Sequence, residues 1–173
     1  MEKLRNNLGK IIVTMGLVAA IFLCMTLFQM FDNTSSIDYV GLIAVLLTIA
    51  SSVLLIVFGF KNGKIEKYLL IPFCLYLGAL VLTDLNNIIN KPLWSMAFSL
   101  LVSLSIVAFY VLHLVMKKSV FKDVLVALLI ALSISHLVVL FSIVNITSIS
   151  FLILPALFAL CLVLQKKEEI SNE

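Results

Sequence analysis

The stretch "VLVALLIALSISHLVVLFSIVNITSISFLILPALFALCLVLQ", residues 124–165, contains no charged side chain, and it decides the fold class. A single helix of these 42 residues would be about 63 Å long, roughly twice the hydrocarbon thickness of a bilayer. The stretch must therefore fold back on itself. Its only polar break is "NITSIS", residues 145–150, whose Asn, Thr and Ser side chains favour turns. The sequence predicts two membrane-spanning helices here, 124–144 and 148–165, joined by a tight turn.

The rest of the chain has the same character. Of its 173 residues, 63% are hydrophobic and only 12% are charged, which is too apolar for a water-soluble core. The charged residues fall in clusters that separate four further apolar spans, 11–31, 39–60, 68–84 and 92–116. We therefore predict an all-α integral membrane protein, a six-helix bundle in which residues 1–173 form one transmembrane domain and no soluble domain.

The basic residues predict how this bundle is oriented. Lysine and arginine are retained on the cytoplasmic side of a membrane. Eleven of the twelve basic residues lie on one predicted side, and only Lys91 lies on the other. This predicts a multi-pass protein of the bacterial inner (cytoplasmic) cell membrane with both termini in the cytoplasm. The net charge of +3 reflects this orientation, so the lipid bilayer is the predicted partner and nucleic acid is not.

A match of the chain with itself raises the alternative of two inverted halves. A shift of 83 residues brings spans one, two and three onto four, five and six, and it sets "YLLIPFCLYL", 68–77, against "FLILPALFAL", 151–160. Because each half has three spans, the halves would be inverted in the membrane. The competing explanation is chance, since apolar helices draw on few residue types.

Two prolines occupy equivalent positions in this match, Pro72 and Pro155. A proline inside a spanning helix frees a backbone carbonyl, which must then be satisfied by protein or by water in a cavity. We therefore expect spans three and six to approach each other, with Tyr76, Gly78 and Ala159 lining any cavity between them.

Small residues spaced by four mark one stripe on each of four spans. Helices in lipid associate largely through close packing at small side chains, so we expect these stripes to face inward. The stripes are Gly16, Ala20 and Cys24; Ala44, Thr48 and Ser52; Ser95, Ser99 and Ser103; and Ala127, Ala131 and Ser135.

His136 is a titratable group within the fifth span, and ionisable residues in a membrane are candidates for function. Its position beside Ser135 predicts that it faces the bundle, near the membrane centre. We expect a neutral imidazole hydrogen-bonded to a neighbouring helix, and the alternative is a role in a solute path. The candidate substrate-binding residues are His136, Ser135, Tyr76, Gly78, Ala159, Pro72 and Pro155.

Other chemistry is disfavoured by what the spans lack. No span contains Lys, Arg or Glu, and the nearest Asp is Asp84, which we expect at the edge of an external connection, 83–94. This argues against a pump that uses buried carboxylates. Enzyme motifs are absent, so no catalytic residue, metal or cofactor is predicted. An intramembrane enzyme would require Cys74 or Cys161 to meet His113.

Two main functions remain. The first is binding or transport of a small solute, alone or as the membrane component of a transport system with a transport ATPase. In size, number of spans and predicted cytoplasmic termini, the chain resembles the substrate-binding components of energy-coupling-factor vitamin transporters. It departs from them in the first span, which has no Ala-x-x-x-Ala pattern. The alternative is a non-enzymatic accessory, assembly or immunity-type protein that packs against another integral membrane protein.

Overall fold

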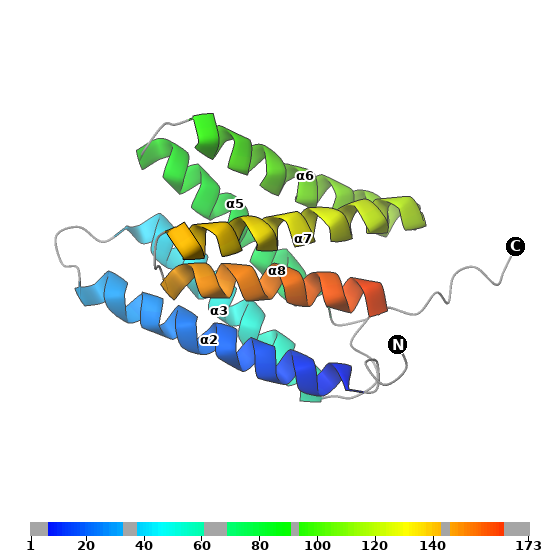
Figure 1. Ribbon diagram of the computed structural model, residues 1–173, viewed down its shortest axis with the longest axis horizontal. Coiled ribbons are helices and arrows are strands. Elements are labelled where there is room, and N and C mark those ends of the chain that lie inside the picture. Colours follow the sequence, from blue (N-terminus) through cyan, green and yellow to red (C-terminus); the bar gives the residue numbers. More distant parts are fainter. Residues whose placement is uncertain (1–6, 33–37, 61–68, 91–93, 143–145, 165–173) are drawn as a thin grey trace, which may run out of the picture.

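A computed structural model describes residues 7–32, 38–60, 69–90, 94–142 and 146–164 of the chain. All six elements in this part are α-helices, as predicted. Figure 1 shows them in chain order: α2 (Leu8–Asp32), α3 (Tyr39–Phe60), α5 (Leu70–Asn90), α6 (Trp94–Met116), α7 (Ser119–Ser142) and α8 (Ile146–Leu164).

Five of these helices, α2, α3, α5, α6 and α7, are long and apolar enough to cross a membrane. In α8 the apolar part measured in this way, Ile149–Leu164, is shorter. The membrane character of the chain is therefore seen in the helices themselves as well as in the composition.

The helices form a closed ring in chain order. Each helix packs against the next, and α8 packs against α2. Neighbouring helices run in opposite directions, so α2 begins and α8 ends at the same end of the bundle (Figure 1). Which end faces the cytoplasm stays a prediction from the charge distribution.

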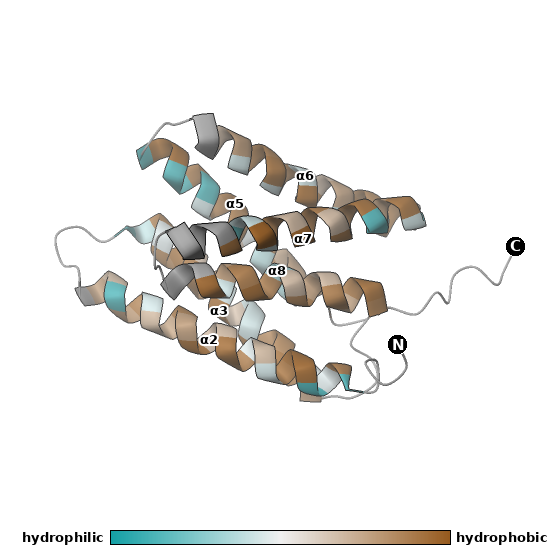
Figure 2. Ribbon diagram, in the orientation of Figure 1, coloured by the Kyte–Doolittle hydropathy of each residue, from teal (hydrophilic) through white to brown (hydrophobic). Residues whose placement is uncertain are grey.

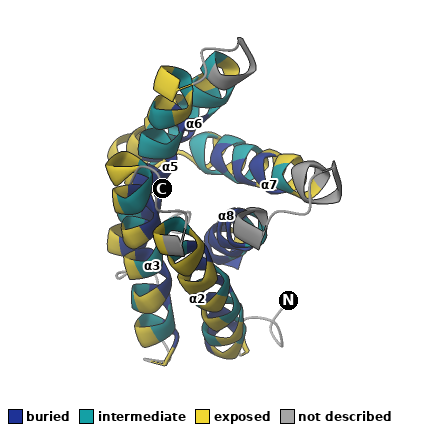
Figure 3. Ribbon diagram, turned by 90° about the vertical axis from the view of Figure 1, so that its left-hand side faces the viewer, coloured by how far each residue is buried: buried dark blue, intermediate teal, exposed yellow. Residues whose placement is uncertain are grey.

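The direction in which successive helices follow one another around this ring tests the prediction of two inverted halves. Seen end-on, α6, α7 and α8 follow one another in the same rotational sense as α2, α3 and α5 (Figure 3). A two-fold axis in the membrane plane turns a bundle over and would reverse that sense in the second half. The arrangement therefore lacks the symmetry that inverted halves require.

The closest helix pair, α2 and α3, meets at glycines. A Cβ atom on Gly59 would lie 2.9 Å from Val13 Cγ2 and 3.0 Å from the backbone oxygen of Gly9. A Cβ atom on Gly16 would lie 2.9 Å from Ile56 Cγ1. Glycine at these positions lets the two backbones approach, as expected for helices in lipid.

The small-residue stripes face inward on some helices and outward on others. On α3 the whole stripe is buried, and on α6 Ser103 is buried and Ser99 is partly buried. On α2 the stripe turns outward, from buried Gly16 to exposed Cys24.

On α7 the prediction is wrong. The stripe residues Ala127, Ala131 and Ser135 are exposed, while Leu125 and Leu129 are fully buried. Every face of this helix is apolar, so spacing alone does not say which face packs inward. Larger side chains make more van der Waals contacts in the bundle than small ones.

The end of α5 also differs from the prediction. The expected external connection from Thr83 is instead helical as far as Asn90, and Figure 2 shows this end of α5 as hydrophilic. Polar side chains bond within the helix here. Thr83 Oγ1 donates to the Ala79 carbonyl at 2.9 Å, and Asn90 Nδ2 donates to Asn86 Oδ1 at 3.0 Å. This longer helix carries Asp84 into the bundle.

Candidate functional site: a polar layer around Asp84

Asp84 is a buried carboxylate, with 6% of its surface exposed. Two serines of α6 donate hydrogen bonds to it. Ser99 Oγ lies 2.7 Å from Oδ1, and Ser103 Oγ bonds to Oδ2. Each carboxylate oxygen therefore has a donor from the neighbouring helix, and the acid is held at the contact between α5 and α6.

The charge of Asp84 has no protein counter-ion among the described residues. Its only bonds there are those to the two serines, and no lysine or arginine pairs with it. A buried carboxylate without a cation is costly, and more so in a bilayer than in water. The prediction that the bundle lacks a buried carboxylate is wrong, because we had placed Asp84 in a solvated connection.

His136 lies at the depth of Asp84. Asp84 is six residues before the end of α5, and His136 is six residues before the end of α7, both about 9 Å from the same end of the bundle. The expected position of His136 near the membrane centre stays a prediction.

The His136 ring is partly buried, and its Nε2 atom is buried with no hydrogen-bond partner. The predicted bond from this nitrogen to a neighbouring helix is therefore not formed. The ring instead packs against Phe151 of α8, with a centroid distance of 5.5 Å.

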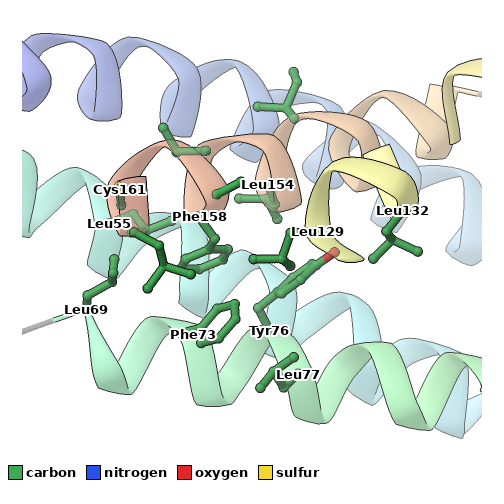
Figure 4. Close-up of a cluster of buried hydrophobic side chains, with 14 of the residues drawn as sticks. Leu55, Leu69, Phe73, Tyr76, Leu77, Leu129, Leu132, Leu154, Phe158 and Cys161 are labelled. Carbon is green, nitrogen blue, oxygen red and sulfur yellow. The ribbon is translucent and has the colours of Figure 1, made fainter. Parts of the chain in front are cut away.

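Tyr76 supplies a second unpaired polar atom. The residue is fully buried, and its hydroxyl has no hydrogen-bond partner. Figure 4 shows this hydroxyl pointing away from α5 toward Leu132 of α7, on the side of the C-terminal half of α5. We refer to Asp84, its partners Ser99 and Ser103, and the two residues with unpaired atoms, Tyr76 and His136, together as the polar layer.

Aromatic rings lie beneath the polar layer and join three helices. Phe73 of α5 packs edge-on against Tyr110 of α6 at 4.4 Å. On its other side, Phe158 of α8 lies 4.7 Å from Phe73 and 5.3 Å from Tyr76. Figure 4 shows the Phe73, Tyr76 and Phe158 rings within a cluster of buried side chains. The third and sixth helices therefore do approach each other, through aromatic side chains.

The predicted site residues fall into two groups. Tyr76, Ala159, Pro72 and Pro155 are buried, and His136 is partly buried. Gly78 and Ser135 are exposed, and a Cβ atom on Gly78 would meet nothing within 4 Å. The expectation that Gly78 lines a cavity between the third and sixth helices, and that Ser135 lies on an inward face, is therefore wrong. Gly78 was placed next to Tyr76 in sequence, and adjacent helical residues point about 100° apart.

The two prolines occupy different local positions. Pro72 lies in the first turn of α5, where a missing N–H is tolerated, and its carbonyl accepts a bond from Ser51 Oγ at 2.7 Å. Pro155 lies inside α8. Its side chain is buried in the bundle.

The cysteines do not form a further site. Cys24 and Cys74 are exposed and Cys161 is buried, and all three are free thiols. Within the described ranges, no three potential metal ligands lie together. The nitrogen Nδ1 of His113 is buried and unpaired, but neither the Cys74 nor the Cys161 thiol bonds to it.

The sequence analysis did not identify Asp84 as a buried residue, although the sequence contains a signal for it. The turn between α5 and α6 is short, so residues equally far from it lie opposite each other. Asp84 is six residues before Asn90, and Ser99 is five residues after Trp94. An inward serine stripe on α6 therefore lies across from Asp84.

No protein-family model, curated protein or solved structure matches the chain.

Proposed function

We propose that this membrane protein binds a small solute in the polar layer and moves it across the membrane, alone or as the membrane component of a transport system. The observation that carries the proposal is buried Asp84, which is bonded by Ser99 and Ser103 and lacks a counter-ion in the described part of the chain. Ionisable residues inside a membrane bundle are retained chiefly for function.

The unpaired atoms of Tyr76 and His136 support a bound partner. Leaving a buried polar group unsatisfied costs about 1–3 kcal/mol. Both atoms are buried inside the bundle. A ligand between them would provide the missing hydrogen bonds. An accessory protein that acts by packing against a partner would have no need of polar atoms inside its own bundle.

The predicted orientation adds direction to this proposal. With both termini in the cytoplasm, the C-terminal end of α5 faces outward, and Asp84 lies about 9 Å from it. The solute would then enter from outside the cell membrane. To reach the other side, the solute would have to pass the packed rings of Phe73, Tyr76 and Phe158. These rings would then have to rearrange, either in this chain alone or with the help of a transport ATPase.

Thermal unfolding in mild detergent tests the proposal. The purified chain is heated with neutral, anionic and cationic small solutes in turn. A true ligand at about one hundred times its Kd raises the free energy of unfolding by about 2.7 kcal/mol. We expect at least one solute to stabilise the parent protein and to lose its effect in Asp84→Asn.

Asp38→Asn is the matched control. Asp38 is exposed and bonds to Gly41 N and Asn86 Nδ2 near the same end of the bundle. Asparagine keeps an acceptor for the helix-capping bond. This variant should respond as the parent does. If no solute stabilises the parent, or if Asp84→Asn responds equally, the proposal is wrong.

A further inference from the structure

Asp84 and its two serine partners bring oxygen atoms of two helices together. Ser99 and Ser103 are four residues apart on α6, so they lie one turn from each other on the same face. Ser99 Oγ bonds to Oδ1 of Asp84 at 2.7 Å, and Ser103 Oγ bonds to Oδ2. Asp84 and Ser103 are buried, and Ser99 is partly buried. A carboxylate and two hydroxyl groups therefore form one oxygen cluster between α5 and α6.

This oxygen cluster carries a negative charge that the described residues do not balance. Both oxygens of Asp84 accept a hydrogen bond, which is the pattern of an ionised carboxylate. The serine hydroxyls are neutral, so they orient the acid without cancelling its charge. In the described ranges, no lysine or arginine pairs with it. A buried charge in a bilayer requires a partner of opposite sign, and one carboxylate requires one positive charge. A monovalent cation meets this requirement.

The serine oxygens can act as ligands together with the acid. A hydroxyl group has one hydrogen to donate and two lone pairs that accept. Because Ser99 and Ser103 donate their hydrogens to Asp84, their oxygens keep lone pairs for a cation. Hard cations prefer such all-oxygen surroundings, whereas transition metals favour imidazole or thiolate. Within the part of the chain that the structure describes, no three His, Cys, Asp or Glu side chains lie together.

The spacing of the oxygens fits an ion of the size of Na⁺. Ca²⁺, whose radius is close to that of Na⁺, lies about 2.3–2.6 Å from its oxygen ligands. Neighbouring oxygens around such an ion are therefore roughly 3 Å apart, which is close to the 2.7 Å between Ser99 Oγ and Oδ1 of Asp84. The larger K⁺ requires longer distances and would push these oxygens apart.

We propose that Asp84, Ser99 and Ser103 bind one sodium ion between α5 and α6. The inference rests on the proposed function and names the ion that balances its acid. Asp84 lies six residues before the end of α5. That end is hydrophilic and carries the exposed side chains of Asn87 and Asn90 (Figure 2). Water at this end completes the coordination of the ion, because cations bound by proteins often keep some of their water.

Direct binding of radioactive sodium tests the inference. The purified full chain, in mild detergent, is kept in a sodium-free buffer whose ionic strength is held constant with choline chloride. We expect saturable binding that approaches one ion per chain. Unlabelled sodium chloride should displace the label at a lower concentration than potassium chloride does. Asp84→Asn should abolish binding. An absence of saturable binding, or equal binding by Asp84→Asn, would overturn the inference.

Two serine variants of α6 test the ligands and keep the acid, so they do not depend on how well Asp84→Asn folds. Ser103→Ala removes the hydroxyl group next to Oδ2, and we expect the sodium concentration for half-saturation to rise about tenfold. Ser105→Ala is the matched control, because Ser105 Oγ donates to the Leu101 carbonyl at 2.7 Å within the same helix. It should bind sodium as the parent does. An unchanged midpoint in Ser103→Ala, or an equal rise in Ser105→Ala, would overturn the role of the hydroxyl groups.

Sodium binding and stabilisation by other solutes are separate measurements, so their failures are distinguishable. Displacement of the label by calcium chloride at a lower concentration than by sodium chloride would overturn the assignment to a monovalent ion. If no alkali cation binds but another solute stabilises the parent through Asp84, the sodium inference fails and the proposed function stands. If no alkali cation binds and no solute stabilises the chain, both fail.

Discussion

At the residue scale, neighbouring polar side chains have different surroundings. Ser133 is buried and donates to the Leu129 carbonyl at 3.0 Å, whereas Ser135, two residues later, is exposed. Asp84 is buried, and Asp38 is exposed although it bonds to the same end of α5. Residue type does not distinguish these cases, because the neighbouring helix decides which polar atom is enclosed.

Substitutions at His136 test its role. Because Nε2 has no partner, His136→Leu removes an unsatisfied buried atom without breaking a bond. We expect the ligand-free variant to be as stable as the parent or more stable by about 1 kcal/mol, measured by thermal unfolding in detergent. Its stabilisation by a solute that stabilises the parent should fall.

His136→Gln is the comparison, because it keeps a donor and an acceptor. We expect it to retain more of the parent's response to that solute than the leucine variant. If His136→Leu instead lowers stability by about 2 kcal/mol and His136→Gln does not, the histidine holds the fold together through a hydrogen bond, as the sequence alone suggested.

At the element scale, the turn between α6 and α7 contains a strained residue. Lys117 has a positive φ of 52°, and its N–H bonds to the His113 carbonyl at 3.0 Å, which closes the end of α6. A side chain in this left-handed conformation costs about 1–2 kcal/mol, which glycine avoids. Lys117→Gly should therefore raise the free energy of unfolding by about 1 kcal/mol. Lys118→Gly is the control, and a gain of equal size there would contradict this account.

Two glycines give a second prediction at this scale. Gly59→Ala places a Cβ atom 3.0 Å from the backbone of Gly9, so α2 and α3 must separate. Gly78→Ala meets nothing within 4 Å and gains helix propensity. We expect the first substitution to lower thermal stability by about 1–3 kcal/mol and the second to raise it by up to about 1 kcal/mol. Equal effects would mean that α2 and α3 are not in close contact.

At the scale of the whole molecule, six alternating helices place the start of α2 and the end of α8 together (Figure 1). Reporter fusions after Lys64, Lys118 and Lys167 should therefore all read the same side, and the basic residues predict the cytoplasm. A fusion between α5 and α6 should read the outside. An external reading after Lys167 together with a cytoplasmic reading after Lys118 would contradict six spans.

The sequence by itself determined the all-α membrane class, the six helices and the division of residues 124–165 into two of them, although α8 begins at Ile146, inside the expected turn 145–150. These follow from how long each apolar run is and where charges interrupt it, and both are local properties. The tertiary structure alone decided that Asp84 is enclosed, that Tyr76 and His136 are left unpaired, and that Gly78 and Ser135 face outward. The physical reason is that nearly every face of these helices is apolar. Lipid and a neighbouring helix then solvate a face almost equally well, so packing between side chains far apart in the sequence chooses which face is buried.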